Sequence, residues 1–206
     1  MKFEELELQN IWWKETIEKD YHLEKLKRKR FVYHPKILDL TELKKEKSGI
    51  YTLVGPRQIG KTTYMKLLIK ELLKDYNALN LLYLSCENIT KEHFKEAILF
   101  FLGDIAKEGK KFIFLDEISF VEGWEIAELE LYNKGLIKDT IIINSGSSSL
   151  NLKKSSDRLP GRKGKGKLYY FLPLTFREFV FLVSKHAEGI DKNPMAFLGT
   201  LNKLLI

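Results

Sequence analysis

The chain has few of the features that mark secreted and membrane proteins. It contains a single cysteine, Cys86, so it cannot form an intrachain disulfide, and a reducing compartment such as the cytoplasm is expected. The N-terminal stretch MKFEELELQN lacks the apolar core of a signal peptide. The longest apolar patch, AILFFL at 97–102, is far too short to cross a bilayer, and no membrane partner is expected. With 206 residues and no internal repeat, the chain is expected to form one ordinary core with a small appended piece.

The excess of positive charge is modest. Lysine and arginine total 35 against 28 acidic residues, which gives a net charge of +7. This balance permits an anionic partner without requiring one. The run KLKRKR at 25–30 suits either a nucleic-acid arm or a solvated helix face, of which the solvated face is the commoner case.

From residue 50 onward, apolar strand-like stretches alternate with helical ones. Nearly continuous apolar runs such as FIFL and TIII are typical of parallel strands, which are buried on both faces. The alternation therefore predicts an α/β fold with a parallel sheet packed on both sides. The expected strands are 50–54, 81–85, 111–117, 139–146 and 167–173, and helical KEHFKEAILFFLGDIAKEG is expected at 91–109.

The stretch GPRQIGKT at 55–62 has the G-x-x-x-x-G-K-[ST] spacing of a phosphate-binding loop. It follows an apolar run and precedes a segment whose apolar residues have helical spacing. Backbone N–H groups of such a loop, together with the positive end of the next helix, attract phosphates. Lys61 is expected to neutralise β- and γ-phosphate oxygens, and Thr62 to offer its hydroxyl to Mg²⁺. The residues expected around the nucleotide are Gly55, Pro56, Arg57, Gln58, Ile59, Gly60, Lys61, Thr62 and Thr63.

Two carboxylates stand where the apolar stretch KFIFLDE ends. Ligands of an open parallel sheet bind beyond the carboxyl ends of its strands, so Asp116 and Glu117 are expected beside the loop. Asp116 is expected to join Thr62 around Mg²⁺, and Glu117 to activate a water in line with the γ-phosphate. The fourth strand is expected between the loop strand and the carboxylate strand, where Asn144 or Ser145 would sense the γ-phosphate.

Together these motifs resemble the AAA_14 group of archaeal and bacterial AAA-type ATPases, in which a DUF4143-like region often follows the nucleotide domain. The resemblance spans about 49–184, and QNIWW at 9–13 is also similar to an N-terminal feature of some members. The segments that carry it are GPRQIGKTT at 55–63, FLDEISFVEGWE at 114–125, SGSSS at 145–149, LPGR at 159–162 and LPLTFREF at 172–179.

The resemblance implies a P-loop NTPase of the AAA/ASCE type, a three-layer α/β sandwich with a parallel sheet of order 5-1-4-3-2. It also implies ATP and Mg²⁺ as ligands. It assigns Lys61 and Thr62 to the phosphates and metal, Asp116 to the metal and Glu117 to water activation. Finally, it points to Arg162 as a γ-phosphate or transition-state contact, within its own subunit or across a homo-oligomer.

The segment around Arg162 allows more than one interpretation. LKKSSDRLPGRKGKGK at 152–167 holds seven basic residues and one acid, and its glycines disfavour a stable helix. It is expected on the nucleotide edge of the sheet, because it follows the SGSSS strand end. Residues 153–167 could bind the phosphates of a nucleic acid. Alternatively, the loop could bring Arg162 to ATP. The third interpretation is a solvated surface loop.

Three regions are expected along the chain. Residues 1–48 form an N-terminal helical extension, 49–172 the ATPase core, and 173–206 the start of a C-terminal helical region. The last residues, MAFLGTLNKLLI, have helical apolar spacing without a closing cap, so the C-terminal region is expected to be truncated. The resembling proteins continue into a second domain, and that output domain is expected to be missing here or reduced to one or two helices.

Three functions fit the motifs. The first is an ATP hydrolase that remodels a partner, and the second is a slowly hydrolysing nucleotide-gated switch. Glu117 favours the hydrolase, because a pure binding module needs no water activator. A small-molecule kinase shares the phosphate loop, but no acceptor-binding segment is evident.

Overall fold

The structure is a computed structural model, and it describes residues 3–29, 32–33, 35, 37–147 and 167–186. Its centre is a five-stranded sheet of order β2-β3-β4-β1-β5, in which each neighbouring pair is parallel. The strands are β1 (Gly49–Val54), β2 (Leu81–Ser85), β3 (Lys111–Asp116), β4 (Thr140–Gly146) and β5 (Leu168–Tyr170). The predicted order 5-1-4-3-2 is confirmed, including the position of β4 between the loop strand and the carboxylate strand.

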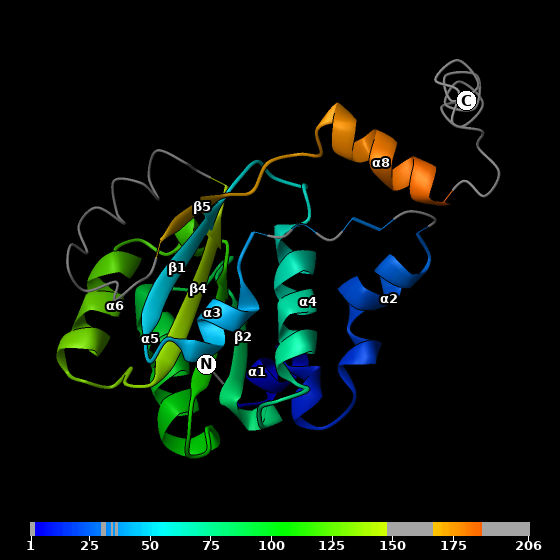
Figure 1. Cartoon of the computed structure of the whole chain (residues 1–206). Coiled ribbons are helices and arrows are strands. Elements are labelled where there is room, and N and C mark those ends of the chain that lie inside the picture. The colour runs from blue at the N-terminus through cyan, green and yellow to red at the C-terminus, as the bar shows by residue number, and fades with distance from the viewer. Residues whose placement is uncertain (1–2, 30–31, 34, 36, 148–166, 187–206) are drawn as a thin grey trace.

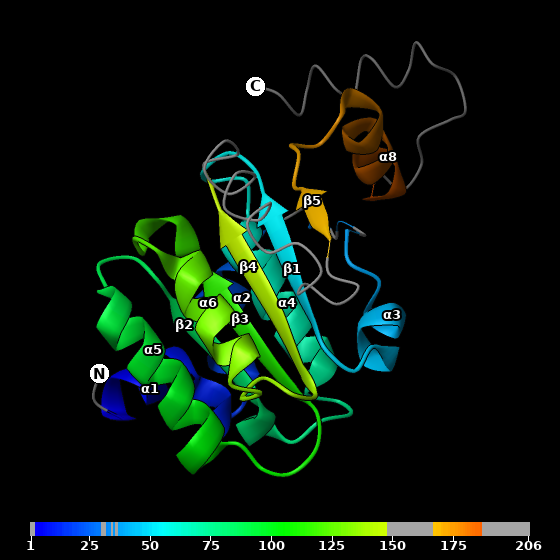
Figure 2. The same cartoon turned by 90° about the vertical axis from the view of Figure 1, so that its left-hand side faces the viewer.

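Helices cover both faces of the sheet, which gives the predicted three layers (Figures 1 and 2). Helices α4 (Lys61–Leu72) and α2 (Tyr21–Lys27) lie on one face, and α5 (Lys91–Phe100) and α6 (Trp124–Asn133) on the other. The remaining helices are α1 (Phe3–Gln9), α3 (Leu40–Lys45) and α8 (Phe176–His186). Short turns of other helix types are η1 (Ile11–Trp13), η2 (Ile17–Lys19), η3 (Ala78–Asn80), η4 (Phe101–Ile105) and η5 (Ile118–Phe120).

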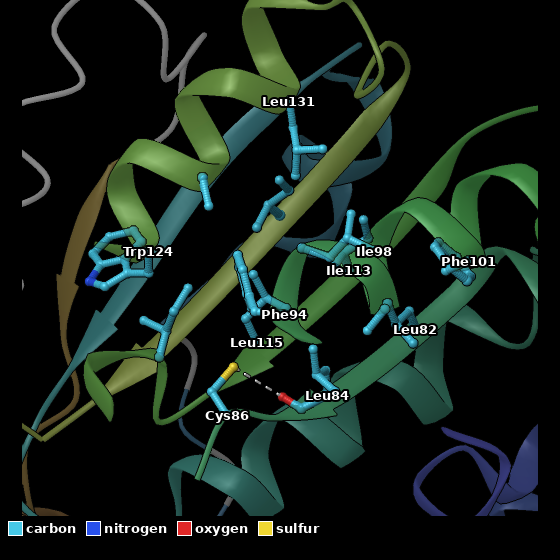
Figure 3. Close-up of a cluster of buried hydrophobic side chains, with 14 of the residues drawn as sticks. Leu82, Leu84, Cys86, Phe94, Ile98, Phe101, Ile113, Leu115, Trp124 and Leu131 are labelled. Carbon is cyan, nitrogen blue, oxygen red and sulfur yellow. Dashed lines mark hydrogen bonds between the residues drawn. The ribbon is translucent and has the colours of Figure 1, made fainter. Parts of the chain in front are cut away.

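Each face of the sheet has its own apolar core. Alternate residues of β4 divide between them: Ile142 belongs to the core under α5 and α6, and Ile141 and Ile143 belong to the core under α4. Figure 3 shows the first of these cores, where Phe94 and Trp124 pack over the strands. All residues of β1 and β4 are buried, which explains why their sequences read as continuous apolar runs.

Two elements are shorter than the sequence suggests. The helix expected at 91–109 ends at Phe100 and continues only as the π-helical turn η4, which contains Gly103 and Asp104, residues of low helix propensity. Strand β5 ends at Tyr170, although Phe171 still donates its N–H to the Val54 carbonyl over 2.7 Å. Pro173 follows and has no N–H to extend the ladder. Among the described residues, no helix is long and apolar enough to span a membrane.

Side chains from residues 9–13 cover the outer edge of β2. Asn10 accepts from the Tyr83 N–H over 2.6 Å and donates to the Tyr83 carbonyl over 2.9 Å. Trp12 and Trp13 both donate their indole N–H groups to the Leu81 carbonyl, over 3.1 and 3.0 Å. These side chains replace a missing strand, because an uncovered edge would leave backbone donors and acceptors unpaired.

Replacing Asn10 with alanine is expected to destabilise the chain by about 3 kcal/mol, since it leaves buried backbone groups of Tyr83 without partners. Urea unfolding measures the change. Asn133→Ala is the matched control, because Asn133 is exposed at the end of α6 and should shift stability by no more than about 0.5 kcal/mol. Equal losses in both variants would show that Asn10 does not protect the β2 edge.

Candidate nucleotide site

The GPRQIGKT loop joins β1 to α4 at the carboxyl edge of the sheet. Gly55 has no room for a side chain, because a Cβ there would lie 2.1 Å from the Phe171 carbonyl oxygen. Gly60 adopts φ 97° and directly precedes α4, and Gln58 also has a positive φ of 62°. The loop therefore turns sharply into the N-terminus of α4, the geometry that favours phosphate binding.

Lys61 is buried beneath this loop. Its ammonium donates to the Gly55 carbonyl over 3.0 Å and to the Pro56 carbonyl over 2.9 Å. It also lies 3.2 Å from Glu117 Oε1, which comes from the end of β3. The ion pair brings the lysine of the loop and the glutamate predicted to activate water into direct contact.

Asp116 is held by three hydroxyl groups from three different elements. Thr62 Oγ1 donates to Asp116 Oδ2 over 2.6 Å, and Tyr83 Oη donates to the same oxygen over 2.8 Å. Ser145 Oγ donates to the other oxygen, Oδ1. Burial and the neighbouring Asp116 carboxylate raise the pKa of Tyr83 well above its usual value, so this hydroxyl remains a donor.

A hydroxyl and a carboxylate oxygen in contact are ligands of the kind that Mg²⁺ prefers. Thr62 and Asp116 supply this pair at the wall of the cavity described below. Among the described residues, no group of three or more His, Cys, Asp or Glu side chains is placed to hold a metal. The pair formed by Thr62 and Asp116 nevertheless fits Mg²⁺, because this ion usually retains waters and substrate phosphates and takes only one or two protein carboxylates.

Glu117 adopts a left-handed backbone conformation with φ 52°, which is uncommon for a residue with a side chain. The Glu117 N–H donates to Ser145 Oγ over 3.1 Å, and Glu117 Oε2 accepts from the Ser147 N–H over 3.2 Å. The strained turn thus leads the chain away from β3 and directs the carboxylate toward Lys61.

A cavity of about 470 Å³ opens beside these groups. It is lined by His22, Arg57, Gln58, Thr62, Tyr83, Ser85, Glu87, Asp116 and Glu117. The cavity is polar, and it contains both motif carboxylates and one loop arginine. Burial lowers the pKa of His22, which reaches this site from the N-terminal segment.

A second, more apolar cavity of about 330 Å³ is also lined by residues of the loop. Its lining includes Ile59 and Gly60 from the loop, Tyr64 from α4, and Phe171. Tyr33 and Pro35 close it from the N-terminal side. An apolar, aromatic-lined cavity beside a phosphate loop suits a nucleotide base.

The two residues predicted to sense the γ-phosphate lie on opposite faces of β4. Ser145 lies at the site through its contact with Asp116. Asn144 does not: its side chain is on the opposite face of β4, where it donates to Glu128 of α6 over 2.8 Å. The expectation that Asn144 faces the phosphates is corrected, because neighbouring strand residues point to opposite faces.

Other predicted residues are only partly placed. Arg162 and the basic positions 153–166 lie outside the described residues, as does Arg30 of the run 25–30. Within that run Lys25, Lys27 and Arg28 are exposed, and Lys27 pairs with Glu18 over 3.0 Å. The catalytic roles given to the remaining residues stay predictions.

Sequence reasoning missed several residues at the site. Tyr83 and Ser147 contact the motif carboxylates directly, and His22 lines the cavity. A signal for Tyr83 existed, since a tyrosine two residues before the polar end of LLYLS falls near the same sheet edge. No sequence pattern placed His22 there.

Comparisons with known proteins agree with this geometry. The profile of the AAA domain family AAA_14 matches residues 47–180. No curated protein matches the chain. The Aeropyrum pernix ORC1 protein, solved in complex with DNA, is similar over 84% of this chain and 52% of its own, with 17% identity and a TM-score of 0.54. The Thermotoga maritima RuvB Holliday junction branch migration motor is similar over 81% and 49%, with 18% identity and a TM-score of 0.51. The chain therefore spans about half the length of these two proteins, and the similarity concerns the fold.

Proposed function

The chain belongs to the AAA domain family AAA_14, and we propose on that basis that it binds ATP with Mg²⁺ and hydrolyses it. The observation that carries the proposal is the meeting of two motifs at one sheet edge. Lys61 and Thr62 of the loop contact Glu117 and Asp116, respectively, from the end of β3. Such contacts gather phosphate, metal and water-activating groups around one point.

In this proposal the triphosphate follows the loop and the base enters the apolar cavity. Loop N–H groups and the N-terminus of α4 bind the phosphates, and Lys61 exchanges the Gly55 and Pro56 carbonyls for phosphate oxygens. Tyr64 and Phe171, whose rings meet edge to face at 5.4 Å, offer an apolar wall to the base.

Thr62 and Asp116 would hold the metal. When bound, Mg²⁺ neutralises the charge that develops on the phosphate oxygens. Ser145 contributes by donating to the second Asp116 oxygen, Oδ1, and by accepting from the Glu117 N–H. Glu117 accepts the proton of the attacking water once it has left Lys61.

A slowly hydrolysing switch is the second candidate, and one observation favours it. In this structure both Glu117 oxygens are engaged, one by Lys61 and one by the Ser147 N–H. These contacts must break before the carboxylate accepts a proton, so nucleotide binding and activation are separable steps. Under this alternative the chain binds Mg-ATP tightly but turns over slowly.

Steady-state phosphate release, measured with Mg²⁺ and with excess EDTA, tests the proposal. We expect release that requires Mg²⁺ and falls within the usual range for enzymes, about 1 to 1,000 per second when fully stimulated. Release of fewer than one phosphate per chain, with tight Mg-ATP binding, would favour the switch. Absence of both binding and release would contradict both candidates.

Nucleic acid is the proposed stimulating partner to test first. The Aeropyrum pernix protein was solved with DNA, and the basic segments 25–30 and 153–167 of this chain suit phosphate contacts. Any DNA affinity carried by these segments should fall steeply with salt.

The buried single cysteine, Cys86, suits the cytoplasmic location that we propose.

Arg162 is proposed to contact the γ-phosphate, in its own subunit or in a second copy. Arg162→Ala is then expected to reduce hydrolysis by about 10³- to 10⁵-fold while changing ATP affinity little. Phosphate release and calorimetry measure the two effects. Arg158→Ala, in the same basic segment, is the control. Parent turnover in Arg162→Ala at saturating ATP would remove Arg162 from the mechanism.

A further inference from the structure

We propose that the N-terminal segment 9–28 is a built-in part of the ATP site and positions the Asp116 carboxylate for Mg²⁺. The connection runs from Asp20 through Lys66 to Tyr83, and we call these three residues the positioning array. The inference rests on the proposed function, since it assigns Asp116 to the metal. It adds a positioning role for residues outside both nucleotide-binding motifs.

Asp20 fixes the N-terminal end of the array. Its Oδ1 accepts from the His22 N–H over 2.9 Å and so caps the start of α2. Its Oδ2 lies 3.1 Å from Lys66 Nζ, on the neighbouring helix α4. Because one carboxylate performs both tasks, the start of α2 is tied to α4 (Figure 1).

Lys66 is the centre of the array, and its side chain is only 3% exposed. Its ammonium donates to the Gln9 carbonyl over 3.1 Å, lies 4.7 Å from the Trp12 ring centroid, and lies 3.6 Å from the Tyr83 ring centroid. A buried ammonium is costly and gains little net stability from its partners. Its presence between the N-terminal segment and a residue of the metal site therefore suggests a positioning task.

Tyr83 connects Lys66 to the Asp116 carboxylate. The Lys66 ammonium lies over the Tyr83 ring, and the Tyr83 hydroxyl donates to Asp116 Oδ2. Of the three hydroxyls on Asp116, that of Thr62 is the one proposed to bind the metal itself. Tyr83 and Ser145 then remain to hold the carboxylate in place, as partners of metal ligands commonly do.

Two further contacts join the same segment to the site. His22, two residues after Asp20, lines the cavity that contains Asp116 and Glu117. The Gln9 side chain accepts from the Ser85 N–H over 2.7 Å, at the end of β2, and Ser85 lines that cavity as well. The N-terminal segment thus forms part of the cavity wall as well as part of the support beneath it.

Tyr83→Phe tests the array, because it removes one hydroxyl and keeps the ring beneath Lys66. In EDTA, we expect the variant to bind a fluorescent ATP analogue with unchanged affinity. Mg²⁺ tightens this binding, and we call the Mg²⁺ concentration that gives half of the gain in affinity the Mg²⁺ midpoint. We expect this midpoint to rise by about 10-fold or more. Tyr51→Phe is the matched control, a buried tyrosine of β1 whose loss of a hydroxyl should leave both values unchanged. An unchanged Mg²⁺ midpoint in Tyr83→Phe would overturn the inference and leave the proposed function intact.

Asp20→Asn tests whether the N-terminal segment takes part. Asparagine still caps α2, so the variant should fold, but it removes the anion facing Lys66. We expect a higher Mg²⁺ midpoint here too, and a double variant with Tyr83→Phe whose shift is smaller than the product of the single shifts. A parent-like midpoint in Asp20→Asn, or purely multiplicative shifts, would contradict the array. A parent chain that binds no nucleotide would instead refute the proposed function and the inference together.

Discussion

Lys61→Ala is expected to weaken ATP binding by at least about 100-fold. The loop keeps its N–H groups but loses its only buried cation, and hydrogen bonds to charged groups contribute about 1.5–3 kcal/mol each. Isothermal titration calorimetry with Mg-ATP measures the change.

Lys74→Ala provides the matched control for this experiment. Lys74 follows α4, is exposed, and pairs with the nearby Glu71 on the protein surface over 2.6 Å. Its removal lowers the net charge by the same amount but should leave the affinity for ATP unchanged. Parent-like ATP binding by Lys61→Ala would show that the loop does not bind the phosphates.

Glu117→Gln is expected to retain Mg-ATP binding and lose hydrolysis by about 100- to 10,000-fold. The amide keeps the shape of the side chain but cannot accept the proton of the attacking water. Binding of Mg-ATP should be as tight as in the parent or tighter, because Lys61 no longer has a competing carboxylate at 3.2 Å. Phosphate release and calorimetry on the same preparation separate the two effects.

Two further variants show whether the loss of hydrolysis in Glu117→Gln is specific to water activation. Asp116→Asn should instead weaken the Mg²⁺ dependence of binding, since it alters the metal ligand. Glu122→Gln is the neutral control, because Glu122 is an exposed glutamate five residues beyond Glu117. Hydrolysis at the parent rate in Glu117→Gln would remove the water-activating role and support the switch.

Local patterns in the sequence identified the parts of the site that lie within single motifs. The spacing of GPRQIGKT marks a loop between strand and helix, and KFIFLDE places Asp116 and Glu117 at a strand end. Both stretches lie at one sheet edge, because all five strands are parallel. The position of the fourth strand between the loop strand and the carboxylate strand was expected from the order of the motifs along the chain. The full order 5-1-4-3-2 came from the family resemblance, since local periodicity does not say which strands are neighbours.

Long-range pairing explains most of what the sequence did not reveal. Asn10 bonds to Tyr83, 73 residues away, and nothing in the charged N-terminal region marks Asn10 as cover for a strand edge. Lys66 reads as one more polar position of α4, yet it is buried against Trp12 and Asp20. Asn144 was misplaced for another reason: strand alternation allows only one of two adjacent residues to face the loop.

The structure of the chain with Mg²⁺ and a non-hydrolysable ATP analogue tests the central claim most directly. The account predicts phosphates along the 55–62 loop, Lys61 Nζ on phosphate oxygens in place of the Gly55 and Pro56 carbonyls, and the metal at Thr62 beside Asp116. A nucleotide bound elsewhere, or Lys61 still bonded to those carbonyls beside a bound nucleotide, would contradict it.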